Sequence, residues 1–203
     1  MSLEWLRHTE RLDQAALQES VRLLAQGEPV FGCIVERLGY PPLWERAPGF
    51  PTLVHIILEQ QVSLASARAA FERLNDACLG VTPQSFLALD DAHLKRIGFS
   101  RQKTAYCRGL ASEIVAGSLD LECLVQMDDQ SARAYLVRLK GIGPWTAEIY
   151  LLMALLRPDA WPIHDRALAI AVQRAFGLAQ PPSPDELERI GAAWRPQDRK
   201  SVV

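Results

Sequence analysis

The sequence predicts an all-α protein, and three observations support that fold class. Apolar residues recur at the three- and four-residue spacing of amphipathic helices along most of the chain. No segment shows the sustained apolar and polar alternation of a half-buried strand. Residues that cap helix N-termini, such as serine and aspartate, precede many of the apolar runs, and glycine or proline follows several of them. We therefore expect about ten helices.

The first half of the chain divides into short helices separated by glycine and proline. Leu17, Val21 and Leu24 mark the apolar face of the first, which Gly27 and Pro29 end. Ser63, Asp90 and Ser100 are expected N-caps. The expected helices are 13–26, 31–38, 53–59, 64–78, a short one from Thr82-Pro83, one after Asp90, and one from Ser100 to about residue 116.

The second half predicts four more helices. Asp129 is the expected cap of a helix that ends at Leu139. The next three are expected at 144–156, 165–176 and 184–194. No internal repeat or long linker interrupts the pattern.

Composition limits the classes of protein that this chain can belong to. It has 203 residues, 49% hydrophobic residues and a formal net charge of −2. No run approaches the roughly 20 apolar residues of a membrane-spanning helix. The charged N-terminus lacks the apolar stretch of a secretion signal, so we expect an intracellular protein, cytoplasmic or nuclear. The spacing of its four cysteines fits neither a zinc site nor a compact disulfide framework.

Residues 139–146 (LKGIGPWT) have the pattern of two helices joined by a tight glycine hairpin. Gly141 and Gly143 flank Ile142, and glycine permits a sharp turn and a close approach to another backbone. Pro144 stands where the second helix begins, at a position that tolerates a missing N–H. The positive end of that helix suits an anion such as a nucleic-acid phosphate.

A carboxylate follows this hairpin at the start of another expected helix. Asp165 lies 22 residues after Gly143. A phosphate grip followed by a carboxylate suggests an enzyme that acts on DNA, although aspartate is also a routine N-cap. Clustered cations, among them Arg96, Arg101 and Arg108, could supply a local basic face or simply a solvated one.

Four segments in order resemble the helix-hairpin-helix glycosylase superfamily, and within it the DNA-3-methyladenine glycosylase II family. The hairpin with G-P-W-T-A and the P-x-x-D of Pro162–Asp165 resemble that branch. Residues 50–67 (FPTLVHIILEQQVSLASA) are similar to the family's stretch ending in Q-Q-V-S, and residues 97–105 (IGFSRQKTA) to its G-x-S-x-x-K-A segment. The resemblance covers roughly residues 30–196.

The resemblance implies one glycosylase domain over residues 1–203, made of two helical lobes with a base-binding cleft between them. One lobe would hold about 51–139, and the hairpin lobe would combine 1–50 with 140–203. The family's W-R-P, here at Trp194–Pro196, normally leads into one more helix. Residues 197–203 are polar and short, so we expect that helix to be lacking and the hairpin lobe to be less stable.

The resemblance also assigns roles at the reacting sugar and base. Asp165 matches the catalytic aspartate, whose charge would stabilise the positive sugar as the base departs. Trp145 stands where lyase-competent relatives carry a nucleophilic lysine, so a monofunctional enzyme is expected. An indole there could stack on a cationic alkylated base or anchor the core. The remaining base-pocket candidates, each with an alternative core or structural role, are Trp44, Tyr40, Phe50 and His164.

The expected DNA contacts come from three segments. Gln61 would fill the space left by the extruded nucleotide, although these glutamines could instead cap a helix end. Ser100, Arg101 and Lys103 would contact the DNA backbone. The full set of candidates is Gln60, Gln61, Ser63, Ser100, Arg101, Lys103, Lys140, Gly141, Ile142, Gly143 and Thr146.

The implied partner is double-stranded DNA with damaged bases, bound by a monomer. No metal site or other cofactor is expected, and no cysteine follows Cys123 to form the iron–sulfur cluster of some relatives. A monovalent cation at the hairpin carbonyls, around residues 138–142, is implied by some relatives. Two other functions stay open: the same scaffold removing uracil, an oxidised base or a mispaired base, and a non-catalytic module that only binds DNA.

Overall fold

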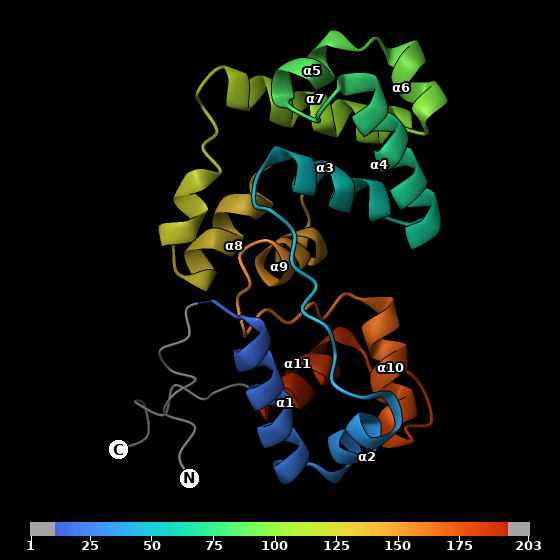
Figure 1. Cartoon of the computed structure of the whole chain (residues 1–203), viewed down its shortest axis with the longest axis vertical. Coiled ribbons are helices and arrows are strands. Elements are labelled where there is room, and N and C mark those ends of the chain that lie inside the picture. Colours follow the sequence, from blue (N-terminus) through green and yellow to red (C-terminus); the bar gives the residue numbers. More distant parts are fainter. Residues whose placement is uncertain (1–10, 195–203) are drawn as a thin grey trace. The chain divides into compact units, whose positions relative to one another are not determined.

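The computed structural model describes residues 11–194, and all regular secondary structure in this range is helical (Figure 1). These residues form two compact units. One is the continuous segment 46–155, and the other joins residues up to 45 with residues from 156 onward. Among the described residues, no helix is both long enough and apolar enough to cross a membrane.

The 46–155 unit is built around helix α3. Eight of the ten α3 residues are buried, because this helix is apolar on almost every side. Helices α4, α7 and α9 pack against it. Full burial of one large apolar side chain contributes about 1.5–3 kcal/mol to folding. The helices are α3 (Phe50–Glu59), α4 (Leu64–Cys78), α5 (Pro83–Ala88), α6 (Asp91–Ile97), α7 (Arg101–Val115), α8 (Asp129–Val137) and α9 (Pro144–Met153), with a 3-10 helix η2 (Glu122–Gln126).

Local capping fixes where several of these helices begin. Ser63, Asp90 and Ser100 each accept a hydrogen bond from the backbone N–H three residues on, as the sequence predicted. The expected cap Asp129 is wrong: the Asp128 carboxylate accepts the Ser131 N–H at 2.8 Å, and Asp129 is already helical. Adjacent aspartates offer two caps, and only the extended backbone of Asp128 places its carboxylate over the first turn.

The other unit contains α1 (Gln14–Gly27), α2 (Pro29–Leu38), α10 (Arg166–Phe176) and α11 (Pro184–Ala192). Its core consists of residues from α10 and α11, with aromatic rings around them. The Phe31 ring lies 5.0 Å from that of Trp194, which stacks on Phe176. An open, largely apolar cavity of about 620 Å³ lies between α1, α2 and α10. Consistent with this loose packing, α1 and α2 contain no buried residue.

Several observed boundaries differ from the expected ones. Helix α3 begins at Phe50 instead of residue 53, because Pro51 fits the first turn. Helix α9 ends at Met153, before the apolar run does. The hairpin and α9 belong to the 46–155 unit, whereas a lobe boundary near residue 139 was expected; α9 packs on α3 and α8. Residues 197–203, where a missing terminal helix was expected, lie outside the described residues.

Candidate DNA interface and active site

The helix-hairpin-helix has the geometry that its sequence predicts. Residues 138–143 connect α8 to α9, and Ile142 donates to the Leu139 carbonyl at 3.0 Å within the turn. Leu139 and Ile142 are buried and anchor the hairpin in the core. No side chain caps the start of α9 at Gly143, so the dipole of α9 leaves a position suited to an anion.

The two hairpin glycines have different surroundings. Gly141 has φ 93°, in the region that favours glycine, and an added Cβ would overlap the Tyr106 side chain. Gly143 has φ −90°, and apart from its neighbours in the chain no atom lies within 4 Å of where its Cβ would be. The turn therefore requires glycine at 141 for packing within the fold, whereas Gly143 leaves open space in front of the hairpin.

Gln60 contacts the hairpin from the end of α3. Its Nε2 donates to the Gly141 carbonyl and to Thr146 Oγ1, both at 3.0 Å. Thr146 is only 2% exposed, so its hydroxyl faces the interior. The Gln60 amide nitrogen and the Thr146 hydroxyl thus bond each other within the fold, and a DNA contact by either residue stays a prediction. The Ile142 side chain is likewise buried, which leaves only its backbone to approach a ligand.

The next residues form an exposed tip between α3 and α4. Gln61 adopts φ 57°, unusual for a residue other than glycine, and is exposed. Val62 and Leu64 are also exposed, at 47% and 71%. Ser63 caps α4 through its hydroxyl, which accepts the Ser66 N–H at 3.2 Å. The tip thus presents one amide and two apolar side chains to solvent.

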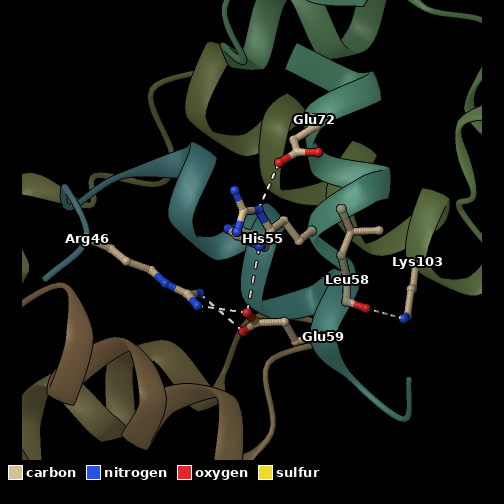
Figure 2. Close-up of polar contacts among 7 residues, drawn as sticks. Arg46, His55, Leu58, Glu59, Glu72 and Lys103 are labelled. Atoms are coloured by element: carbon tan, nitrogen blue, oxygen red, sulfur yellow. Dashed lines mark hydrogen bonds and ion pairs between the residues drawn. The ribbon is translucent and has the colours of Figure 1, made fainter. Parts of the chain in front are cut away.

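The three expected contacts at the start of α7 separate into two kinds. Ser100 caps the helix, and Arg101 is exposed. Lys103 instead points inward, and its Nζ donates to the Leu58 carbonyl at 2.7 Å (Figure 2). The same Nζ donates to the Gln60 carbonyl at 2.9 Å. Burial lowers the pKa of the Lys103 ammonium. The Lys103 ammonium therefore bonds the end of α3, and a phosphate contact by this residue stays a prediction.

A charged group missed in the sequence lies at the same end of α3. The Glu59 carboxylate, on a side chain only 6% exposed, accepts two hydrogen bonds from Arg46, at 2.7 and 3.2 Å. His55 Nε2 lies 3.7 Å from Glu59 Oε1 (Figure 2). The His55 ring stacks on that of Phe71. A lone glutamate in an apolar helix could have signalled a buried ion pair, since buried carboxylates require a partner.

The candidate catalytic residue lies in the other unit. Asp165 is half-buried and caps α10, its carboxylate accepting the Leu168 N–H at 2.9 Å. Its own N–H donates to the Pro162 carbonyl at 2.8 Å, which closes a tight turn around the neighbouring His164. His164 is exposed. The carboxylate therefore stands at the N-terminal end of a helix, where the helix dipole is positive.

The aromatic pocket candidates lie in unlike environments. Trp145, in the first turn of α9, is half-buried. Phe50 is a core residue, 4% exposed, with its ring packed edge-to-face on Phe86, which corrects its assignment to a pocket wall. Tyr40 and Trp44 are exposed, at 47% and 66%. Lys140, beside the hairpin, is also exposed.

No cluster of three or more histidine, cysteine or carboxylate side chains suited to a metal ion occurs among residues 11–194. Of the hairpin carbonyls at 138–142, Leu139 O and Gly141 O already accept hydrogen bonds from Ile142 and Gln60. The cation expected there stays a prediction.

Comparisons with known proteins find similarity to base excision DNA repair proteins. The family model described as HhH-GPD superfamily base excision DNA repair protein matches residues 54–197. A DNA-3-methyladenine glycosylase of Bacillus subtilis is 28% identical over 170 residues, which cover 78% of this chain and 54% of that protein. The chain thus spans about half the length of the curated relatives it matches.

Two solved structures have the same fold. A DNA-3-methyladenine glycosidase from Bacillus halodurans is 27% identical, with a TM-score of 0.72 over 87% of this chain and 82% of that one. A 3-methyladenine DNA glycosylase from Schizosaccharomyces pombe, in complex with abasic DNA, gives a TM-score of 0.81 at 21% identity. It covers 88% of this chain and 90% of that one, a likeness that shows the fold alone.

Proposed function

The chain belongs to the HhH-GPD superfamily of base excision DNA repair proteins, and we propose that it is a monofunctional DNA glycosylase that removes alkylated bases. The substrate class is 3-methyladenine and similar lesions in double-stranded DNA inside the cell. The names of the relatives from Bacillus subtilis and Bacillus halodurans support this class. The observation that carries the proposal is Asp165, held at the start of α10 and 22 residues beyond the hairpin.

Three groups divide the work of excision in this proposal. The hairpin holds a DNA phosphate in the open space before Gly143, where the α9 dipole favours negative charge. The exposed tip at Gln61 fills the gap left by the extruded nucleotide and offers an amide to the orphaned base. Asp165 stabilises the positive charge that develops on the sugar as the N-glycosidic bond stretches, and orients or deprotonates the attacking water.

Replacement of the carboxylate by an amide tests the assignment. Asp165→Asn retains a good helix cap, so the melting temperature is expected to shift by less than about 4 °C. Release of 3-methyladenine from alkylated DNA is expected to fall at least about 100-fold, because the charge is lost. Asp90→Asn is the matched control: Asp90 caps α6 in the same way, and excision should not change. A mutant at 165 that releases base as fast as wild type would remove Asp165 from the mechanism.

The position of Trp145 supports hydrolysis without strand cleavage. It is the residue after Pro144 in the first turn of α9, and an indole cannot form a Schiff base with the sugar. Borohydride treatment of the protein on DNA with an abasic site is expected to trap no covalent adduct. An adduct would point to another amine, with the exposed Lys140 as the first candidate.

We further propose that the chemistry needs no resident cofactor and that a monomer suffices. Excision measured before and after exhaustive chelation should be equal. The same free-base assay, run on DNA carrying alkylated purines, uracil, 8-oxoguanine or a mismatch, separates the proposed substrate from other lesions. Release of none of these bases, with DNA binding intact, would favour a module that only binds DNA.

A further inference from the structure

Three consecutive residues at the C-terminal end of α3 are each held by a different part of the 46–155 unit. The Leu58 carbonyl accepts from Lys103, and the Glu59 carboxylate accepts from Arg46 (Figure 2). Gln60 is held twice, by its carbonyl to Lys103 and by its side chain to the hairpin. We refer to residues 58–60 with these partners as the brace.

The brace ends directly at the exposed tip. Gln61, the next residue, has the left-handed conformation, which a residue other than glycine keeps only where surrounding contacts hold it. The tip itself has weak internal support: the Val62 N–H reaches the Glu59 carbonyl only at 3.5 Å. Gln61 thus follows directly on three residues that are each held by partners distant in sequence.

Helix α7 connects the brace to the hairpin. Lys103 and Tyr106 lie three residues apart on α7, and so share one face of that helix. The first bonds the end of α3, and the second packs on Gly141 so closely that no Cβ fits between them. The Gln60 side chain completes the connection by bonding the Gly141 carbonyl. The tip and the hairpin are thus fixed relative to each other within one unit.

We propose that Lys103 is a positioning residue, which acts through Gln60 to preset the exposed tip against the hairpin and does not neutralise a DNA phosphate. This inference rests on the proposed function, because the tip can fill the gap left by a nucleotide only in an enzyme that extrudes nucleotides from a duplex. Its ammonium donates to two backbone carbonyls, so its charge is directed at the protein. The exposed Arg101, two residues earlier, is free to face DNA.

The salt dependence of DNA binding distinguishes a positioning residue from a phosphate contact. Each phosphate contact contributes about −0.9 to the slope of log K against log salt concentration. Lys103→Met removes the ammonium and keeps an unbranched side chain of similar length. The Lys103→Met variant should keep the wild-type slope, whereas the matched control Arg101→Met should make the slope less steep by about one unit.

Single-turnover excision measures what the brace contributes. With enzyme saturating alkylated duplex DNA, Lys103→Met is expected to lower the excision rate about tenfold or more, since two hydrogen bonds to a charged donor are lost. Lys103→Arg, which can donate to both carbonyls, should recover part of the rate. Gln60→Met removes the other end of the brace and should reproduce the loss if Lys103→Met proves too unstable to study.

Amide hydrogen exchange in the free protein tests the brace without DNA. Residues 58–62 should exchange faster in Lys103→Met and in Gln60→Met, but not in Arg101→Met. The proposal is overturned by a Lys103→Met variant with a shallower salt slope and an unchanged excision rate, or by unchanged exchange and rate in both brace variants. If the wild-type protein releases no alkylated base, the proposed function fails, and the exchange measurement still decides whether the brace exists.

Discussion

At the scale of single residues, the hairpin offers a matched pair of glycines. Gly141→Ala forces a side chain into left-handed backbone and into Tyr106, so we expect a loss of about 2 kcal/mol or more. For a chain of this size that lowers the melting temperature by roughly 4–8 °C. Gly143→Ala meets open space and should melt within about 2 °C of wild type.

The same pair separates folding from DNA binding. A methyl group at 143 projects toward the space assigned to the phosphate, so Gly143→Ala should bind DNA more weakly although it folds normally. Thermal melts and equilibrium binding to one duplex measure both effects. If Gly143→Ala binds DNA as well as wild type, the hairpin does not grip its ligand at that point.

Residue-scale prediction from the sequence succeeded where a role depends on neighbours along the chain. The glycines, Pro144 and the cap position of Asp165 were all visible in local pattern. The direction of Gln60 was not, because its partner Gly141 is 81 residues away. The direction of the Lys103 side chain could not be predicted either, since its acceptors lie more than 40 residues earlier in the sequence. A motif identifies a residue type, and only the fold decides whether its polar atoms face inward.

At the scale of elements, the pair α3 and α4 should respond to pH through His55. Its ring stacks on Phe71 of α4 and faces Glu59, with Arg46 and Arg68 nearby. Burial, and then the charge of Arg46, lower the pKa of His55 below its usual 6.5, while Glu59 opposes the shift. The unfolded chain therefore binds this proton more readily than the folded one. The stability due to neutral His55 is full above about pH 6.5 and decreases as the pH falls below that value.

Thermal melts check this direction. Wild type should lose stability between about pH 7.5 and pH 5.5, and His55→Gln should lose less over the same interval. His93→Gln, on α6 in the same unit, is the matched control and should follow wild type. An equal loss in His55→Gln and wild type would show that His55 does not carry this dependence.

Helix starts were predictable where one side chain caps the first turn. A start depends on one side chain that caps a turn three residues away, as Ser63 and Ser100 do. The end of α9 depends on distant backbone instead: the Arg46 N–H bonds the Met153 carbonyl at 2.8 Å. The apolar run continues past that point, so periodicity alone extended the helix to residue 156.

At the scale of the whole molecule, the two units should differ in autonomy. The 46–155 segment is continuous and contains its own core around α3, so it is expected to fold alone, with a helical circular dichroism spectrum and a cooperative melt. Residues 11–45 alone should be largely unfolded, because neither α1 nor α2 buries a residue fully even in the complete chain. A 46–155 fragment without a cooperative transition would contradict this expectation.

The resemblance placed the division between units too early, near residue 139. The resemblance assigned the helix-hairpin-helix to the same lobe as Asp165. Contacts of α9 with α3 and α8 assign it to the other unit instead. Such packing depends on which faces of several helices are apolar. A short sequence motif does not contain that information.

The hydrogen bond between Arg46 and Met153 also bears on how the chain folds during synthesis. Residues 11–45 leave the ribosome before residues 46–155, with Leu24 and Phe31 still lacking the cavity walls that α10 later supplies. The 46–155 unit is complete before α10 is made, and its folding brings Arg46 and Met153, near its two ends, together. Once the 46–155 unit has folded, residues up to 45 and residues from 156 onward are joined by a short connection instead of a flexible chain of 110 residues. The loop-closure entropy of bringing these two segments together is therefore already lost when the 46–155 unit folds. If the 46–155 unit fails to fold, helices α1 and α2 of the nascent chain would stay exposed to chaperones for longer.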